Sequence, residues 1–296
     1  MARRLLVVAG LVGALALAAC GGSGGGTTTS DRAVTTGSTP GGPTSTTGTE
    51  GTSSTAPYRG DRASTTGDGS TSTTTPASLP RAGSRTRQTI SLASGQTLEY
   101  TLVLPDVYRA GTKYPVLLAL PPGGQGQPEV DALLDKWWAA EGRARGWIIV
   151  SPVAPGGQLF FTGSSDTLVA LMDAVASAYP PEGGGFHLAG VSNGGLSAYR
   201  IALDEPKRFL SLLVAPGFPP EDSDRAKLAR LAKIPVASYV GENDSAWREG
   251  SVRTVKELRR RGGTATLTVS PGEGHILTKV TAKQLFDVLD ATRPGR

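Results

Sequence analysis

One short stretch of the chain has the residue types and the spacing of a serine nucleophile. An apolar run over residues 186–191 leads into the turn Gly190–Gly194 (GVSNG), and a helix-like run follows it. A serine on such a tight turn projects its hydroxyl above the sheet, and its neighbours two residues away must be small because the backbones crowd there. The N–H of Asn193 would lie at a helix N-terminus, where it can stabilise an oxyanion. We therefore predict that Ser192 is a nucleophile and Asn193 an oxyanion donor.

The five-residue motif is weak evidence by itself, because glycine supplies 40 of the 296 residues. The segment Gly21–Gly25 matches the same pattern, but no strand-like run precedes it and no helix-like run follows. The strand before Ser192 and the helix after it are what favour that serine. The alternative is a glycine-rich strand-to-helix turn in some other α/β fold.

A serine nucleophile needs a base, and the chain has only two histidines. His275 stands just beyond the last expected strand, in the loop Pro271–His275 (PGEGH). His187 precedes Ser192 on the same strand, roughly 16 Å down the sheet at about 3.3 Å per residue, so it cannot reach the hydroxyl. We expect His275 to be the base and His187 to be a packed strand residue. The alternative for His275 is an exposed loop histidine.

The base in turn needs a carboxylate that fixes its tautomer and stabilises the imidazolium. Asp244 follows the strand expected over residues 235–240 and lies between the serine and the histidine in chain order. Glu242, Asp222 and Glu273 compete for this role. Asp244 could also simply cap the helix that follows it. We assign the acid to Asp244.

The loop after the strand expected over residues 114–120 should complete the oxyanion hole. Pro121 and Pro122 begin this loop, and neither can donate because proline has no N–H. Gly123 is therefore the expected donor, or Gly124 if the loop is shifted by one residue. The alternative is a plain Pro-Gly turn.

The elements that must position these residues alternate along the chain. Strands are expected over residues 89–92, 97–104, 114–120, 146–151, 210–215, 235–240 and 264–270, and before the serine turn; helices are expected over 128–143, 165–179, 222–232, 248–261 and near 277–291. A hairpin followed by βαβ alternation predicts a mostly parallel sheet with antiparallel N-terminal strands and helices on both faces. The site should lie at the carboxyl ends of the strands.

These residues together resemble the α/β-hydrolase superfamily over residues 89–296. The segment Leu188–Gly195 (LAGVSNGG) and the compact layout look like the branch of esterase D, feruloyl esterases and polyhydroxybutyrate depolymerases. The prolines 121–122 replace the His-Gly-Gly of many relatives. The resemblance implies the α/β-hydrolase fold and hydrolysis of small-molecule or polymer-derived carboxylic esters through an acyl-enzyme, with no cofactor or metal. The alternatives are an acyltransferase or a peptidase on the same fold, and a binding lipoprotein whose site has decayed.

Substrate size should follow from a short connection. Only Pro216–Glu221, six residues with three prolines, separates an expected strand from the next helix, which is too short and stiff for a helical lid. We expect an open cleft that accepts soluble short-acyl or aromatic-acid esters, walled by the substrate-binding aromatics Phe160, Phe161, Phe218 and Trp247. The alternative for these four is ordinary packing.

Residues 1–19 have the pattern of an export signal. Arg3 and Arg4 precede an uncharged apolar run over residues 5–19, which would span roughly 22 Å as a helix, less than the about 30 Å of a bilayer core. The run ends at Cys20, the only cysteine, in a context that resembles the lipobox of bacterial lipoproteins. We expect an exported protein, anchored to the bacterial cell envelope and its membrane by lipid on Cys20. The alternative is an ordinary secretory peptide.

Residues 20–86 are almost entirely Gly, Ser, Thr and Pro, with few apolar residues to bury, so we expect a disordered linker. Residues 87–296 should form one catalytic domain. The net charge is +5 and the isoelectric point is about 9.4, but two of the positive charges lie in the expected signal. The others are spread along the chain, so we expect no nucleic-acid partner.

Overall fold

The computed structural model describes residues 81–295 of the chain. The expected signal peptide, Cys20 and most of the expected linker lie outside these residues. The first strand begins at Arg85, slightly before the domain boundary expected at residue 87. Between residues 81 and 295, none of the helices has the length and apolar character needed to cross a bilayer.

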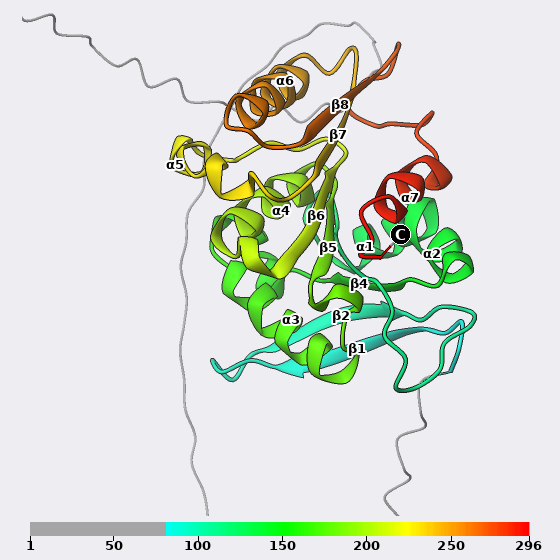
Figure 1. Cartoon of the computed structure of the whole chain (residues 1–296). Helices are drawn as coiled ribbons and strands as arrows, with labels where there is room; N and C mark the ends of the chain where they lie inside the picture. Colours follow the sequence, from blue (N-terminus) through cyan, green and yellow to red (C-terminus); the bar gives the residue numbers. More distant parts are fainter. Residues whose placement is uncertain (1–80, 296) are drawn as a thin grey trace, which may run out of the picture. The chain divides into compact units, whose positions relative to one another are not determined.

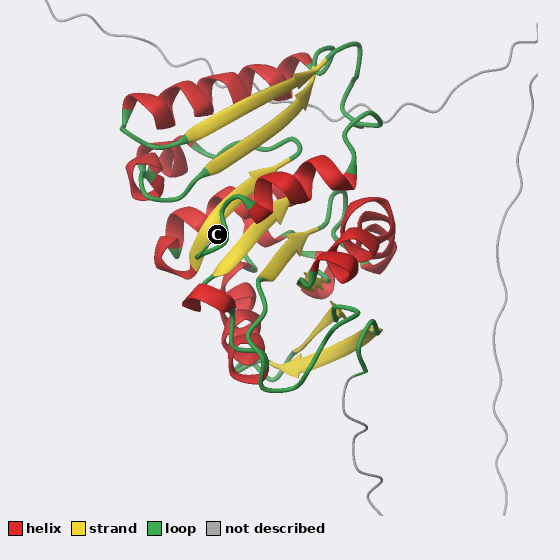
Figure 2. Cartoon of the chain, turned by 45° about the vertical axis from the view of Figure 1, so that its right-hand side comes forward, coloured by secondary structure: helices red, strands yellow, loops and turns green. Residues whose placement is uncertain are grey.

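The described residues form one eight-stranded sheet flanked by helices (Figures 1 and 2). The strand order is β1-β2-β4-β3-β5-β6-β7-β8. The strands are β1 (Arg85–Ser91), β2 (Thr97–Val103), β3 (Val116–Leu120), β4 (Ile148–Pro152), β5 (Phe186–Gly190), β6 (Phe209–Val214), β7 (Val236–Gly241) and β8 (Ala265–Ser270). β1 and β2 pair antiparallel with each other, and β2 pairs antiparallel with β4, whereas all later pairings are parallel. The expected mostly parallel sheet with an antiparallel start is confirmed.

The central strands are apolar because both of their faces are covered. Every residue of β3, β4 and β5 is buried. Parallel strands between two helical layers read as continuous apolar runs rather than alternating ones, which is the pattern of these segments. The sequence therefore dictates a three-layer arrangement.

Two separate cores occupy the two sides of the sheet. One contains α3 and α4 together with Val255 and Leu258 of α6, and the other contains the buried residues of α1 and α7 with the tryptophans between α1 and α2. Figure 1 shows α3, α4 and α6 on one side and α1, α2 and α7 on the other. The helices are α1 (Gln127–Leu133), α2 (Ala139–Arg145), α3 (Ser165–Ala178), α4 (Asn193–Asp204), α5 (Asp222–Ala226), α6 (Ser245–Arg260) and α7 (Ala282–Asp290).

The helix expected over residues 128–143 is in fact interrupted. A π-helical turn, η1 (Leu134–Trp138), separates α1 from α2. The wider turn changes the helical register, and both Trp137 and Trp138 are buried against the sheet side of the segment. Single π-helical turns are frequent next to functional sites, and this one borders the pocket described below.

Two other helices are shorter than expected. The helix expected over residues 222–232 ends at Ala226 and continues as a separate 3₁₀ turn, Leu228–Leu231. The helix expected near residues 277–291 begins only after Thr281, whose side chain caps it. The residues before this cap are held in a non-helical loop, because side chains of η1 bind the carbonyl oxygens of Leu277 and Val280.

Candidate active site

Ser192 stands on a strained turn between β5 and α4. Its φ is +55°, a conformation that residues other than glycine rarely adopt. A Cβ atom on Gly190 would lie 2.1 Å from the carbonyl oxygen of Gly194, and one on Gly194 would lie 2.2 Å from that of Leu120. Both glycines are therefore required by close backbone approach, as the sequence predicted. This geometry is a nucleophile elbow.

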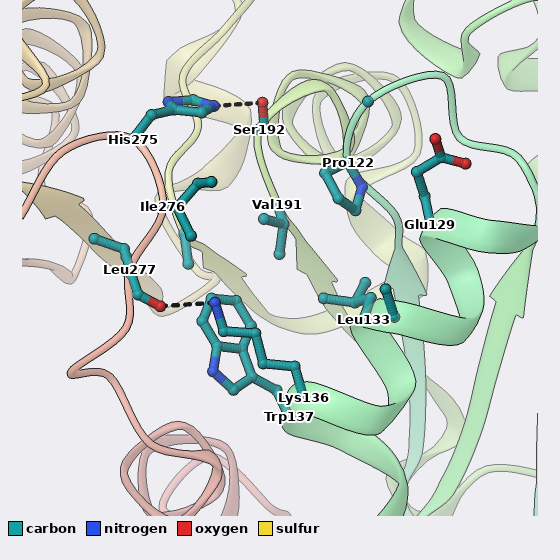
Figure 3. Close-up of a pocket in the computed structure, with 13 residues that line it drawn as sticks. Pro122, Glu129, Leu133, Lys136, Trp137, Val191, Ser192, His275, Ile276 and Leu277 are labelled. Carbon is teal, nitrogen blue, oxygen red and sulfur yellow. Dashed lines mark hydrogen bonds between the residues drawn. The ribbon is translucent and has the colours of Figure 1, made fainter.

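Ser192, His275 and Asp244 form a continuous chain of hydrogen bonds. Ser192 Oγ lies 2.7 Å from His275 Nε2, and His275 Nδ1 lies 2.7 Å from Asp244 Oδ2. Figure 3 shows the first of these bonds at the rim of a pocket. The His275 side chain is 39% exposed and that of Asp244 only 11%. A shielded carboxylate that orients an accessible imidazole is the arrangement needed for proton transfer to and from the serine.

The three competing carboxylates are engaged elsewhere. Glu242 Oε2 accepts a hydrogen bond from the Gly272 N–H at 2.8 Å, and Asp222 is fully exposed beside Arg225. Asp244 is the residue before α6, but its side chain makes no helix-capping bond. Its carboxylate is instead turned to the histidine.

Glu273 has a structural position in the loop that carries His275. Its buried carboxylate accepts hydrogen bonds from Ser270 Oγ at 2.5 Å, from Thr278 Oγ1 at 2.7 Å, from the Lys279 N–H at 2.7 Å and from the Thr278 N–H. Burial alone would raise the pKa of Glu273, but these hydrogen bonds outweigh it and lower the pKa to about 2. The ionised carboxylate therefore ties both ends of this loop together.

Backbone contacts also join the acid loop to the histidine loop. The Asn243 N–H donates to the carbonyl oxygen of Glu273 at 2.8 Å. A Cβ atom on Gly241 would lie 2.0 Å from the carbonyl oxygen of Gly274, so the two loops are in direct backbone contact. The separation of Asp244 from His275 is thus set by the main chain as well as by their own hydrogen bond.

The expected oxyanion loop lies next to the serine turn. Asn193 is the first residue of α4, so its N–H belongs to the helical turn in which no helix carbonyl can accept. The Asn193 side chain donates to the carbonyl oxygen of Gly123 at 2.8 Å, and Gly123 has a φ of +57°. The structure therefore places the main chain of Gly123 in contact with Asn193, the residue after Ser192.

Gln125 holds this loop in place, although no motif in the sequence marks it. The residue is completely buried and its φ is +57°. Its side-chain amide donates to the carbonyl oxygen of Pro121 at 3.2 Å and to Ser197 Oγ at 3.1 Å, and its oxygen accepts from the Phe160 N–H at 2.9 Å. One polar side chain thus connects the oxyanion loop to α4 and to the loop after β4.

A pocket of about 390 Å³ opens beside Ser192 and His275. In Figure 3, Ser192 and His275 lie at one end of the pocket, and Lys136 and Trp137 lie at the other. The walls are mostly apolar. The lining residues are Pro122, Gly123, Glu129, Ala132, Leu133, Lys136, Trp137, Val191, Ser192, Ala215, His275, Ile276 and Leu277. The pocket is therefore bounded by the oxyanion loop, by α1 and η1, by the ends of two strands and by the His275 loop.

The structure brings none of the four expected substrate-binding aromatics into this pocket. Phe160 is 1% exposed and packs in the core on the α3 and α4 side, next to Phe161 in a 3₁₀ turn. Phe218 is half-buried and packs against Trp247, with ring centroids 5.1 Å apart. Trp247 contacts the triad, since its ring centroid lies 4.8 Å from that of His275. The expectation is wrong for Phe160, which is buried in the core, and residues of the segment Glu129–Trp137 line this pocket in place of the expected aromatics.

The sheet, the elbow after β5 and the Ser-Asp-His chain order define the class: residues 81–295 have the α/β-hydrolase fold. Within residues 81–295, no cluster of His, Cys, Asp or Glu side chains could hold a metal ion. Solved structures with this fold include several esterases.

One similar structure is a thermostable esterase (TM-score 0.53, 18% identity). The match covers 63% of this chain, and the chain spans only 54% of the length of that esterase. Another is a ferulic acid esterase (TM-score 0.53, 17% identity, covering 71% of this chain and 97% of the esterase). A third is an S-formylglutathione hydrolase from Agrobacterium tumefaciens (TM-score 0.56, 14% identity, covering 72% of this chain and 96% of the hydrolase). Dipeptidyl peptidases match as well. No protein-family model matches the chain, and no curated protein does.

Proposed function

We propose that the protein is a serine hydrolase that cleaves carboxylic esters. The observation that carries this proposal is the pair of 2.7 Å contacts that link Ser192 to His275 and His275 to Asp244, with the serine on a strained elbow. Such an arrangement activates a hydroxyl that is otherwise a weak nucleophile. The fold shared with solved esterases supports the same reaction class.

The reaction proceeds in two balanced steps. Ser192 Oγ attacks the acyl carbon while its proton passes to His275 Nε2, and the resulting oxyanion is stabilised by the N–H groups of Asn193 and Gly123. The alcohol leaves with the proton that His275 held, and the acyl group remains on the serine. Water then attacks, gives a proton to His275, and the acid is released as Ser192 regains its hydrogen.

The contact with Asp244 sets the direction of proton flow. The Nδ1–H of His275 donates to the carboxylate, which leaves Nε2 as an acceptor for the serine hydroxyl. When Nε2 gains the proton, the imidazolium is stabilised by the adjacent negative charge.

An acyltransferase or a peptidase would use the same triad, because the acceptor and the scissile bond are selected by the surroundings. The 39% exposure of the His275 side chain favours hydrolysis over transfer, since water can reach the acyl-enzyme. The intact hydrogen-bond chain argues against a binding lipoprotein with a decayed site.

The test is hydrolysis of p-nitrophenyl acetate together with labelling by a fluorophosphonate. The wild-type protein should turn over the ester and be labelled once per chain, at Ser192, and Ser192→Ala should lose both activities. A wild-type protein that neither hydrolyses the ester nor reacts with the fluorophosphonate would refute the proposal. Faster turnover of a peptide amide than of the matched ester would instead identify a peptidase.

We propose in addition that the protein is exported and anchored by lipid on Cys20. The support is the charged leader, its apolar run and the single cysteine at its end. Cys20→Ser should move the protein from the membrane fraction to the soluble fraction with the specific activity unchanged. Retention of this variant in the membrane fraction would contradict the proposal.

A further inference from the structure

The pocket beside Ser192 is far larger than an acetyl group needs. A water molecule occupies about 30 Å³ of liquid, so about 390 Å³ corresponds to roughly a dozen waters. Leu133, Val191 and Leu277 supply apolar surface along its length (Figure 3). Burial of each additional methylene there should raise kcat/KM about fourfold until the pocket is filled. The site is therefore built for a longer acid or a longer alcohol.

The arrangement of the pocket favours the acid part of the ester. The oxyanion loop at Pro122 and Gly123 lines one side of the pocket, and the buried ring of Trp137 closes its far end. The acyl group stays on the serine through both steps, so it benefits from apolar walls beside that residue. The alcohol must leave past His275, which is accessible to solvent.

A positive charge lies at the far end of this apolar pocket. Lys136 Nζ donates to the carbonyl oxygen of Leu277 at 2.7 Å and lies 4.5 Å from the centre of the Trp137 ring. These contacts aim the ammonium at a fixed place, and an ammonium has three N–H donors. Partial desolvation lowers the pKa of Lys136, whereas the nearby Glu273 charge raises it.

The two carboxylates near the pocket are engaged with the main chain. Glu273 binds its own loop, as described above, and Glu129 Oε2 accepts from the Gly126 N–H at 3.1 Å as part of a helix-capping box. Neither makes an ion pair with Lys136 in the described part of the chain. Lys136 can therefore offer hydrogen bonds to a group that enters from the Ser192 end.

We infer that the pocket selects esters of medium-length acids whose far end carries a carboxylate or a similar anionic group, with Lys136 as the residue that determines this specificity. This inference rests on the proposed esterase function. The acyl chain would lie along Val191 and Leu133, and its terminal anion would meet the Lys136 ammonium. An anionic acceptor gives the stronger, charge-assisted form of this hydrogen bond.

The experiment compares methyl hexanoate with monomethyl adipate, which has the same number of acyl carbons but ends in a carboxylate. Rates are followed by pH-stat, with methyl acetate as the reference ester. The wild-type protein should prefer the adipate, and Lys136→Met should lower the adipate-to-hexanoate ratio of kcat/KM about tenfold. Lys136→Arg should keep most of the preference, because it keeps the charge.

Lys279→Met is the matched control. Lys279 Nζ also donates to a carbonyl of the histidine loop, that of Pro271 at 2.5 Å, but it does not line the pocket. Its replacement should leave the ratio unchanged. Added salt should reduce the adipate preference of the wild-type protein, which tests the charge without any substitution.

The outcomes separate the two proposals. Failure of the wild-type protein to hydrolyse methyl acetate or to react with a fluorophosphonate would refute the esterase function itself. Turnover of methyl acetate with an adipate-to-hexanoate ratio that neither Lys136→Met nor salt changes would overturn only the present inference. Rates that depend on the length of the alcohol but not on that of the acid would also overturn it, by assigning the pocket to the leaving group.

Discussion

The two histidines of the described chain each contact a serine, and only one of them also contacts a carboxylate. His275 Nε2 lies 2.7 Å from Ser192 Oγ, and His187 Nδ1 lies 2.7 Å from Ser211 Oγ. The first pair stands just after the end of β5, and the second stands near its beginning. The contact distance is the same, so the difference in chemistry must come from the surroundings.

The surroundings of the two imidazoles differ in charge and in access. His275 is accessible and its second nitrogen is bound by a carboxylate. His187 is fully buried against Trp147, with ring centroids 4.8 Å apart, and its hydrogen-bonding partners are the hydroxyls of Ser211 and Thr292. Desolvation lowers the pKa of His187 to about 4, so it resists protonation and would be a poor base. A serine–histidine contact therefore becomes reactive only with an acid to hold the imidazolium and a path for substrate.

The strongest test of this comparison removes each serine in turn. Ser192→Ala should lower kcat for p-nitrophenyl acetate by about 10⁴-fold or more, because covalent catalysis is lost. Ser211→Ala removes the equally short contact at the other histidine and should leave kcat within about twofold of the wild-type value. A comparable loss in both variants would show that the two pairs are not functionally different.

The second test removes the charge that distinguishes His275. Asp244→Asn should lower kcat by about 10³-fold, because the amide cannot stabilise the imidazolium and favours the wrong tautomer. The kcat for p-nitrophenyl acetate, compared with that of the wild-type protein at one pH, supplies the check. Glu242→Gln is the control, because Glu242 lies in the same loop but binds only the main chain of Gly272. Equal damage from both substitutions would count against Asp244 as the acid.

The third test concerns how each histidine is held. His187 is fixed by a sheet strand, whereas His275 stands in a loop that Glu273 ties together. Glu273→Ala should lower kcat on the order of 10²-fold with little change in KM, since a displacement of about 1 Å can have that effect on a reacting group. Glu273→Gln keeps an acceptor oxygen and should recover part of the loss. An unchanged kcat in Glu273→Ala would show that the loop does not need this carboxylate.

The sequence indicates Ser192, Asp244 and His275 because the signals for them are a short motif and an order along the chain. The elbow requires small residues at fixed positions around Ser192, and the chain order of nucleophile, acid and base limited the candidates for the other two roles. Spacing alone could not choose between Asp244, Glu242 and Glu273. That choice depends on which carboxylates the main-chain N–H groups bind, which is a property of the folded loops.

The substrate pocket could not be predicted in the same way. The sequence predicts one helix over residues 128–143, but the π-helical turn at Leu134–Trp138 decides which side chains face the site. Phe160 is buried in the core, and Phe218 packs half-buried against Trp247, so neither lines the pocket. Gln125 gave no signal, because a glutamine in a glycine-rich loop is usually exposed. In each case tertiary packing decides the outcome.

A fourth test uses the buried histidine and measures stability rather than activity. The pKa of His187 is about 4 in the folded protein and 6.5 when solvated, so the unfolded chain takes up the proton first as pH falls. The contribution of neutral His187 to the free energy of unfolding is complete above pH 6.5. It is lost progressively as the pH falls toward 4, by about 3 kcal/mol in total. Between pH 6.5 and pH 4, the free energy of unfolding measured in urea should fall less for His187→Gln than for the wild-type protein. Parallel pH dependences in the two proteins would contradict this assignment.

The smallest expected effect concerns the open access to Ser192. The connection between β6 and α5 contains no helix, and its prolines stiffen it, so within residues 81–295 this connection forms no lid that a lipid surface could displace. Rate measured against the concentration of a sparingly soluble ester should therefore level off near the solubility limit. An enzyme with a lid would instead accelerate when droplets appear, and a lipase assayed in parallel provides that positive control. A sharp rise for this protein would mean that another segment covers Ser192 and His275 until a lipid surface displaces it. The Ser192–His275 pair would then not be freely accessible, which would remove one of its differences from the Ser211–His187 pair.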